Sequence, residues 1–295
     1  MPRPIAGARS LAYKVPAMRA YLAINERSRR GRTLAGDVRE ALAVHGVDVV
    51  EGDEALRSGG FDCVIGAGGD GTAVGLIATA IDRGVPLGIV PLGTFNELAR
   101  TLEIPLEIEG AVHLIASGHE RRIDIGRVNG AYFVNEASIG ISSRIARLQT
   151  PELKQRFGFA GVLGTAFQAF RHARPIHVLA YDDRGRCERF RTIQLTIANS
   201  HRFGGLVSVE AAAIDDGWLD LYGVEIDTVL EAFPIAYAMI QGKPHAVPGL
   251  RTLRSARFRI ETKHPHHIVA DGEPAGFTPA LFEVLPKALR VFAPQ

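Results

Sequence analysis

One stretch limits the fold of this chain more than any other. In residues 61–72 an apolar run leads into a glycine-rich turn and then into a helical run. The apolar run predicts a buried strand, and four glycines among residues 66–71 let a ligand approach the backbone closely. The helix expected over about residues 72–82 points its free N–H groups at the turn. Asp70 lies inside the turn, and a phosphate cradle accommodates a carboxylate when a divalent cation is also bound, so this stretch predicts a nucleotide–metal site.

Strands and helices alternate on both sides of this turn, which predicts a parallel sheet with helices on both faces. Ligands of such sheets bind at the carboxyl ends of the strands, where this turn and a second one at residues 91–96 both fall. The predicted strands cover residues 18–24, 47–50, 63–65 and 85–90, and the predicted helices cover residues 32–45, 54–58 and 72–83.

From about residue 124 the pattern changes to strands separated by Gly, Asp and Asn turns, with helical runs at residues 157–172 and 228–241. This pattern predicts an antiparallel, β-rich second domain. We expect a nucleotide-binding α/β domain over residues 18–127 and a β-rich substrate domain over residues 128–277. Residues 278–295 have strand character and are candidates to return to the first domain.

Composition and charge exclude several classes of function. With 295 residues, 46% of them hydrophobic, the chain can bury a sizeable core, but it has no apolar run long enough to span a membrane. Basic residues are concentrated near the start, and residues 1–17 are interpreted as a solvated basic extension that lacks the apolar core of a secretory signal. Aromatic residues do not interleave with the basic ones, so no nucleic-acid partner is expected. The two cysteines show no metal or disulfide spacing, which favours a reducing cytoplasm.

The spacing of Gly66, Gly68 and Gly71 also matches the dinucleotide-binding fingerprint. That fingerprint requires an acid about 20 residues further on, at the end of the next strand. The next strand ends at residues 89–93 without an acid, and Asp70 opposes a bare pyrophosphate. Redox chemistry with NAD(P) is therefore disfavoured.

Several motifs, in a fixed order, resemble the catalytic domain of the diacylglycerol kinase family, which includes bacterial lipid kinases and the sphingosine and ceramide kinases. The motifs are Gly-Gly-Asp-Gly-Thr at residues 68–72, Pro-Leu-Gly-Thr-Phe-Asn-Glu-Leu-Ala-Arg at residues 91–100, Asp-Ile-Gly at residues 124–126, Phe-Val-Asn-Glu-Ala-Ser-Ile-Gly at residues 133–140, Asn-Ser at residues 199–200, the acidic segment at residues 211–220 and Asp-Gly-Glu-Pro at residues 271–274. The resemblance covers most of residues 18–295. It implies an α/β domain similar to those of phosphofructokinases and NAD kinases, followed by an antiparallel β sandwich.

The resemblance implies an ATP-dependent kinase that phosphorylates a lipid hydroxyl, with diacylglycerol as the first candidate and with ATP and Mg²⁺ as cofactors. Phosphoryl transfer needs charge neutralisation, in-line positioning and help with the proton of the acceptor. By resemblance, Asp70 organises the catalytic Mg²⁺, Glu273 is the general base and Asp271 supports the site. Arg100 and Asp124 are implied to form an ordering ion pair beside the nucleotide. The other residues implied to contact ATP or its metal are Gly68, Gly69, Gly71, Thr72, Thr94, Asn96 and Glu97.

A second, structural Mg²⁺ is implied for the acidic segment. Bacterial relatives hold this ion through one aspartate and two backbone carbonyls. In this chain the aspartate corresponds to Asp216, and the carbonyls to those of Ala213 and Trp218.

Two other functions are left open at this point. An NAD kinase shares the Gly-Gly-Asp-Gly turn and a β-rich second domain, and a lipid- or nucleotide-binding regulator would need no catalysis. The motif at residues 91–96 and the late Asp-Gly-Glu favour a lipid kinase. Such an enzyme is expected in the cytoplasm, peripheral to the inner face of the membrane where its lipid substrate lies, and a homodimer is left open.

Overall fold

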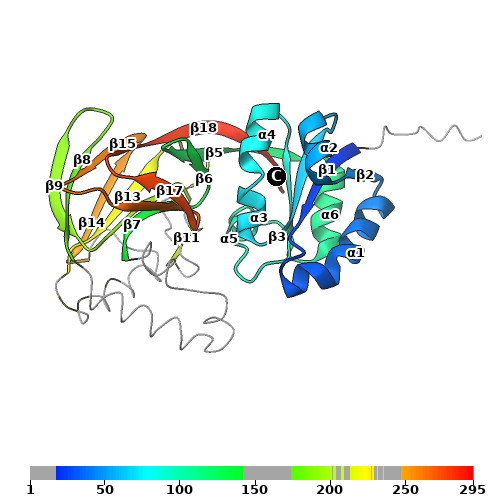
Figure 1. Ribbon diagram of the computed structural model, residues 1–295, viewed down its shortest axis with the longest axis horizontal. Coiled ribbons are helices and arrows are strands. Elements are labelled where there is room, and N and C mark those ends of the chain that lie inside the picture. The colour runs from blue at the N-terminus through cyan, green and yellow to red at the C-terminus, as the bar shows by residue number, and fades with distance from the viewer. Residues whose placement is uncertain are drawn as a thin grey trace, which may run out of the picture.

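The structure, a computed structural model, describes residues 18–141, 174–200, 202–203, 207–208, 213–226, 228, 231, 235 and 247–294. The extension over residues 1–17 and the helix predicted at residues 157–172 lie outside these ranges, as does most of the helix predicted at residues 228–241. Figure 1 shows an α/β half at the right and a β-rich half at the left.

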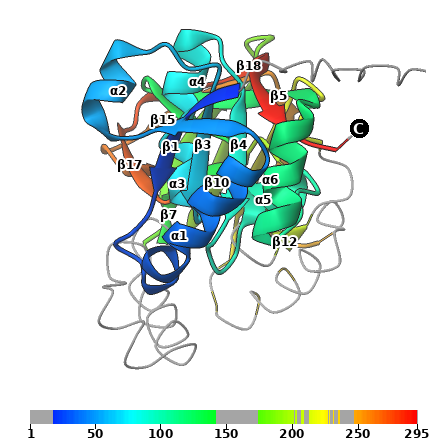
Figure 2. The same ribbon diagram turned by 90° about the vertical axis from the view of Figure 1, so that its right-hand side faces the viewer.

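The N-terminal half is built on four parallel strands in the order β2-β1-β3-β4. Helices cover both faces of this sheet, as Figures 1 and 2 show, which confirms the predicted α/β class. The strands are β1 (Met18–Ile24), β2 (Val47–Val50), β3 (Cys63–Gly68) and β4 (Leu87–Pro91). One face carries α1 (Arg29–Val44) and α6 (Ile108–Ser117), and the other carries α2 (Gly52–Ser58), α3 (Asp70–Val74), α4 (Ile77–Arg83) and α5 (Glu97–Thr101).

All three helices predicted in the N-terminal half differ from their predicted bounds, and α2 begins two residues earlier than predicted, at Gly52. Helix α1 begins at Arg29, three residues earlier than predicted, because the Ser28 hydroxyl accepts a hydrogen bond from the N–H of Gly31 and caps the helix. The helix predicted over residues 72–83 is two helices, α3 and α4. They are separated where the N–H of Leu76 bonds to the carbonyl of Ala73 in a tighter, i→i−3 turn.

The C-terminal half is a β sandwich, which confirms the second part of the predicted fold class. The first sheet continues into it, and a second, antiparallel sheet packs against that continuation. Buried Phe133, Phe190, Phe258 and Phe282 contribute to the core between them. The continuation contains β5 (Glu120–Val128), β6 (Ala131–Phe133), β8 (Ile176–Tyr181), β9 (Cys187–Thr192), β15 (Arg257–Thr262) and β18 (Ala280–Phe292). The second sheet has the order β14 (Leu250–Ser255), β13 (Leu219–Val224), β10 (Gln194–Ala198), β7 (Glu136–Gly140), β16 (His267–Ala270) and β17 (Glu273–Phe277), and β11 (Arg202–Phe203) pairs with β12 (Val207–Ser208).

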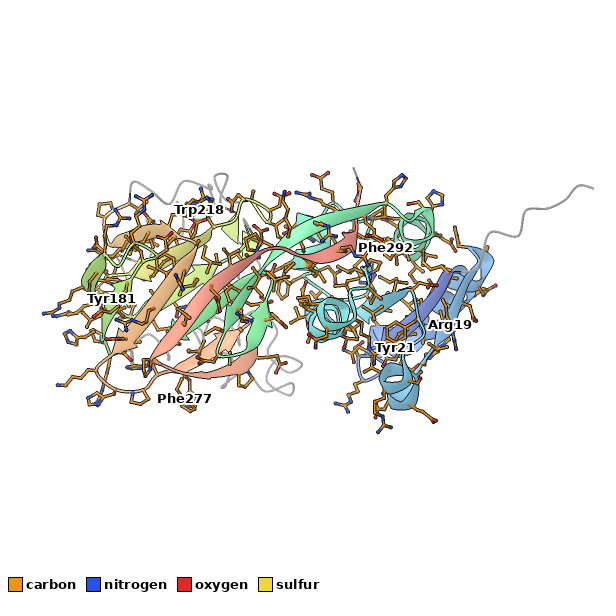
Figure 3. The ribbon with its side chains drawn as sticks, turned by 90° about the horizontal axis from the view of Figure 1, so that it is seen from above. Arg19, Tyr21, Tyr181, Trp218, Phe277 and Phe292 are labelled. Atoms are coloured by element: carbon orange, nitrogen blue, oxygen red, sulfur yellow. The ribbon has the colours of Figure 1, made fainter. Side chains whose placement is uncertain are left out.

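Strand β18 joins the two halves. It pairs in parallel with β4 at Val291 and in antiparallel fashion with β5 and β15, and Figure 3 shows it running from one half to the other beside β5. Its register against β5 shifts between Leu285 and Leu289. The domain boundaries stay a prediction. Among the described residues, no helix is long and apolar enough to cross a membrane.

Candidate active site

Two glycine turns meet at the carboxyl ends of β3 and β4. The N–H of Leu92 donates to the carbonyl of Gly68 at 2.7 Å, and a Cβ atom built on Gly93 would lie only 2.5 Å from the Cα of Gly69. A Cβ on Gly68 would overlap the hydroxyl of Thr72. Glycine is therefore required at these positions because the protein packs against itself there, a reason that the sequence did not reveal. Gly71 differs, since a Cβ there would meet nothing within 4 Å, and this is the glycine that faces open space.

Asp70 ties the two turns together. It is the first residue of α3, and its Oδ1 accepts a hydrogen bond from the N–H of Leu98, at the start of α5, at 3.1 Å. This bond satisfies one of the amide groups that a helix leaves unpaired at its N-terminus. The structure thus gives Asp70 a positioning role in addition to the predicted metal role. The N–H of Thr72 donates to the carbonyl of Gly69 at 2.9 Å, and the Thr72 hydroxyl packs against Gly68.

Asn96 shapes the second turn from within. Its side chain closes a ring with Gly93, accepting from the N–H at 2.9 Å and donating to the carbonyl at 3.0 Å. Asn96 is buried and has a φ of 50°, in the left-handed region that asparagine tolerates better than most residues. Thr94 and Phe95 are exposed at the tip of this turn.

The second half contributes Asp271 through a tight hairpin. Asp271 and Gly272 both have positive φ, 44° and 89°, as a type I′ turn between β16 and β17 requires. The Asp271 carboxylate accepts hydrogen bonds from three successive N–H groups, of Val134 at 2.6 Å and of Asn135 and Glu136 at 3.0 Å each. Asp271 therefore fixes the segment that leads into β7. Its supporting role in catalysis stays a prediction.

Carboxylates from the two halves influence one another electrostatically at this junction. Burial raises the pKa of Asp271 to about 6, an effect that its three N–H donors oppose and that the charge of Asp70 reinforces. Burial, followed by the charges of Asp271 and Glu97, raises the pKa of Glu136 to about 8. Asp70 and Glu97 come from the glycine turns, whereas Glu136 and Asp271 come from the sandwich. Repulsion between carboxylates at this junction makes it a place that favours a positive charge.

Glu136 was not among the predicted site residues, although its motif was recognised. The available signal was a charged residue placed directly before the apolar run of β7. Glu273, the predicted base, is exposed at the start of β17. Its carboxylate has no hydrogen-bond or ion-pair partner among the described residues.

The predicted ion pair between Arg100 and Asp124 is wrong. The guanidinium of Arg100 donates to the carbonyl of Phe95 at 2.9 Å and lies at the surface. The Asp124 carboxylate is buried and accepts from the N–H groups of Gly217 at 2.6 Å and Lys287 at 2.7 Å. It is satisfied by backbone donors from β18 and from the loop before β13, so it holds the two halves together and needs no guanidinium.

In the acidic loop before β13, backbone N–H groups donate hydrogen bonds to the carboxylate of Asp216. Asp216 accepts from the N–H groups of Ala213 at 3.3 Å and Trp218 at 3.0 Å, and from the guanidinium of Arg254. In the part of the chain that the structure describes, no three His, Cys, Asp or Glu side chains are placed to hold a metal ion. A Mg²⁺ ion at this loop stays a prediction.

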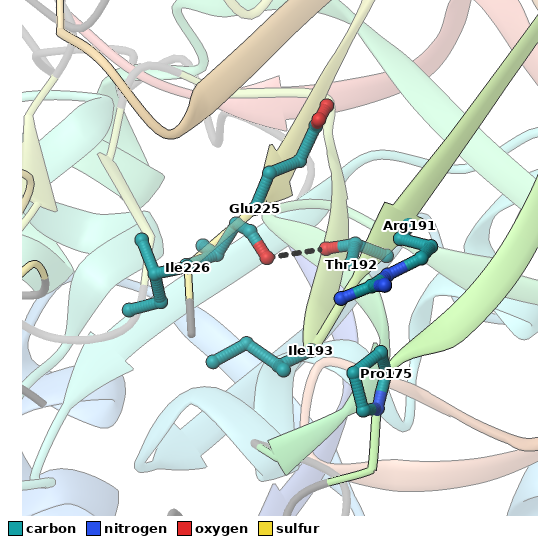
Figure 4. A pocket seen from close by; sticks show the side chains of 7 residues that line it. Pro175, Arg191, Thr192, Ile193, Glu225 and Ile226 are labelled. Carbon is teal, nitrogen blue, oxygen red and sulfur yellow. Dashed lines mark hydrogen bonds between the residues drawn. The ribbon is translucent and has the colours of Figure 1, made fainter. Parts of the chain in front are cut away.

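A cavity of about 180 Å³ lies away from this acidic junction, in the sandwich (Figure 4). Ile193 and Ile226 form its apolar wall, and the Thr192 hydroxyl beside it donates to the carbonyl of Val224 at 2.9 Å. None of its lining residues belongs to the acidic junction, so we assign the chemistry to the junction and not to this cavity.

Comparison with known proteins agrees with this geometry. A family model described as the diacylglycerol kinase catalytic domain matches residues 19–128, and one described as the YegS C-terminal NAD kinase beta sandwich-like domain matches residues 136–293. A diacylglycerol kinase of Staphylococcus epidermidis is 30% identical over 249 residues, which span 83% of this chain and 78% of that protein. A diacylglycerol kinase of Staphylococcus aureus is 29% identical over 251 residues, with the same coverage of 83% and 78%.

Solved structures share the fold. A crystal structure of a diacylglycerol kinase from Bacillus anthracis has a TM-score of 0.74 at 22% identity and covers 94% of this chain and 97% of that chain. An NAD kinase from Archaeoglobus fulgidus in complex with ATP has a TM-score of 0.56 at 16% identity, with 93% of each chain covered.

Proposed function

We propose that this chain, which belongs to the diacylglycerol kinase family, transfers the γ-phosphoryl group of ATP to the hydroxyl group of a lipid, with diacylglycerol as the first candidate. Membership of this family makes the chain a kinase. The observation that carries the proposal is the electrostatic interaction of Asp70 with Asp271, and of Glu97 and Asp271 with Glu136, beside two joined glycine turns.

The donor set at the junction fits a divalent cation that arrives with ATP. Asp70 Oδ2 has no partner among the described residues, and the raised pKa values of Glu136 and Asp271 mark a place where a positive charge would be stabilised. Mg²⁺ commonly uses one or two carboxylates together with substrate phosphates and water, so a complete protein cage is not needed. When bound, the ion would neutralise charge on the transferring phosphoryl group. Asp70 and Glu97 are the residues proposed to hold it.

The glycine turns are proposed to receive the phosphates. Gly71 leaves open space beside Asp70, and the exposed Thr94 lies on the facing turn. The bonds from Leu92 to Gly68 and from Leu98 to Asp70 keep the two turns at a set separation. This preorganisation would position the γ-phosphoryl group before the acceptor arrives.

Proton removal from the lipid hydroxyl is assigned to Glu273. The exposed carboxylate of Glu273 lies two residues after Asp271. The Asp271 carboxylate accepts three backbone hydrogen bonds that hold the hairpin against the β6–β7 segment. A carboxylate at this position can accept the proton of a hydroxyl that comes within hydrogen-bond reach. We propose that the lipid is met at the inner face of the membrane, with the protein bound peripherally.

The test is transfer of labelled phosphate from ATP to lipid. Purified protein is incubated with Mg²⁺ and mixed vesicles prepared from total membrane lipids, and the labelled lipid is identified by mass spectrometry. We expect a phosphorylated lipid from the wild type and from Glu40→Gln, a matched control because Glu40 is exposed on α1, away from the junction. We expect none from Asp70→Asn or Glu273→Gln. Near-normal turnover by either variant would overturn its assigned role.

A second candidate function is NAD⁺ phosphorylation, which the shared fold with an ATP-bound NAD kinase favours. The same incubation with NAD⁺ as the acceptor distinguishes the two. Lipid binding without ATP turnover would instead support a non-catalytic regulator.

A further inference from the structure

The acidic loop at residues 213–220 contains three aspartates, and each of them pairs with an arginine. Asp215 pairs with Arg121 at 2.6 Å, and Arg254 contacts both Asp216 and, at 3.5 Å, Asp220. With two arginines against three carboxylates, the group carries one net negative charge. The charge that would attract a divalent cation is therefore mostly compensated by the protein itself.

The position of Arg254 follows from the sheet. Strands β13 and β14 are antiparallel, and Arg254 stands directly opposite Asp220 in their register. Residues directly opposite each other on neighbouring strands have side chains within contact range. From there the guanidinium reaches Asp216 on the loop that precedes β13. The register of β14 against β13 thus places Arg254 beside the loop.

The carboxylate of Asp216 is already satisfied. Oδ1 accepts from the N–H of Trp218, and Oδ2 accepts from the N–H of Ala213 and from Arg254. A cation bound to this carboxylate would lie beside a guanidinium, and two like charges at such a separation repel strongly when partly removed from water. The residues present therefore do not fit a structural Mg²⁺ ion.

We propose that Arg254 takes the place that a structural divalent cation would hold in this loop, so that the loop folds without a metal. The consequence reaches the junction between the halves. The N–H of Gly217 donates to Asp124 Oδ2, and the carbonyl of Ile214 accepts from the N–H of Asp124. Arg254 thus orders the loop that holds β5 through Asp124. This proposal does not depend on which acceptor the enzyme phosphorylates.

Trp218 makes the loop directly observable, because it is the only tryptophan in the chain. Terbium ions bind carboxylate sites that take Mg²⁺ or Ca²⁺, and they emit light when a nearby excited tryptophan transfers energy to them. We expect no saturable terbium emission excited through Trp218 in the wild type. We also expect no change in its melting temperature between excess EDTA and millimolar Mg²⁺, both measured without ATP.

Two variants distinguish stabilisation of the loop by Arg254 from stabilisation by a bound cation. Arg254→Met should lower the melting temperature in EDTA and recover part of the loss in Mg²⁺ or Ca²⁺, with terbium emission appearing. Arg257→Gln is the matched control, because Arg257 is exposed on β15 and its side chain has no partner among the described residues, so it should behave as the wild type. Terbium emission from the wild type that Asp216→Asn abolishes, or a lower melting temperature of the wild type in EDTA, would overturn the proposal even if Arg254→Met failed to fold.

Discussion

Asp70 has a proposed role in metal binding and also makes a structural hydrogen bond. Its hydrogen bond to Leu98 should survive in Asp70→Asn, because an amide oxygen can still accept from that N–H. The lost negative charge should weaken the proposed metal site far more than the fold. We predict a loss of at least about 100-fold in ATP turnover, the scale of removing one electrostatic contributor, with unfolding free energy lowered by no more than about 1–2 kcal/mol. Turnover assays and chemical denaturation measure the two effects, and a fully active variant would contradict the assignment.

Glu136 should give the protein an unusual dependence of stability on pH. Its pKa is raised from an ordinary 4.5 to about 8, first by burial and then by Asp271 and Glu97, so the folded state holds this proton more tightly than the unfolded chain. The stability that the proton contributes is present below about pH 4.5 and is lost as the pH rises through about 8. Where the pKa of a group differs by one between the folded and the unfolded protein, the difference corresponds to about 1.4 kcal/mol of stability.

Glu136→Gln removes this titration. We predict that the melting temperature of the variant falls less between pH 5 and 8.5 than that of the wild type, and that the variant is the more stable protein at the alkaline end. Parallel melting curves of the two proteins would contradict the raised pKa.

The site residues were predictable from sequence only as far as motifs go. Asp70 interacts electrostatically with Asp271, and Glu97 and Asp271 do so with Glu136. The roles that the resemblance implied for Asp70, Glu97 and Asp271 stay predictions. The partners of each carboxylate were not predictable, because nothing in a motif says which backbone N–H groups will surround it. Asp124 is the clearest example, since its expected partner Arg100 is on the surface and its actual partners are amides far along the chain.

The two glycine turns differ in the space that they leave for a side chain at Gly93 and at Gly71. A methyl group on Gly93 would force the turns apart, because its Cβ would lie 2.5 Å from the Cα of Gly69. We predict that Gly93→Ala lowers unfolding free energy by about 1–3 kcal/mol, as overpacking commonly does, and also reduces ATP turnover.

Gly71→Ala is the matched contrast. Gly71 lies in α3, has open space around it and does not have a positive φ, so alanine should keep or raise stability by up to about 1 kcal/mol. If phosphates approach the backbone there, the apparent affinity for ATP should nevertheless fall. Thermal melting and ATP titration separate the effects, and equal destabilisation by the two substitutions would contradict this account of the turns.

Strands with continuous apolar runs were predictable, whereas polar strands were not. β1 and β2 have their predicted bounds, because each is a short apolar run followed by turn residues. β9 and β14 were missed. β9 (Cys187–Thr192) carries one fully apolar side chain, Phe190, and β14 (Leu250–Ser255) alternates with arginines, so both are recognisable only through the strands with which they pair.

At the scale of the whole molecule, Asp124 couples the halves. Its carboxylate receives the N–H of Lys287, at the register shift of β18, and the N–H of Gly217, in the loop before β13. Removing the carboxylate leaves two donors without their acceptor. We predict that Asp124→Ala lowers unfolding free energy by about 2–4 kcal/mol. This is the lower part of the range expected from about 1–3 kcal/mol for each unsatisfied group, because both donors are only partly buried.

Asp82→Ala is the control for this prediction, because Asp82 is exposed and its side chain has no partner among the described residues; it should change stability by less than about 0.5 kcal/mol. Chemical denaturation of both variants measures the difference. Similar effects of the two substitutions would mean that Asp124 does not join the halves.

The central claim is that the acidic junction transfers phosphate from ATP to a lipid. Its most direct test is a competition in which the wild type receives ATP, Mg²⁺, vesicles containing diacylglycerol, and NAD⁺ in one reaction, with every phosphorylated product identified by mass spectrometry. We expect a phosphorylated lipid and unchanged NAD⁺, with product formation lost in Asp70→Asn. Phosphorylated NAD⁺ as the only product, or ATP-dependent lipid phosphorylation that persists in Asp70→Asn, would contradict it.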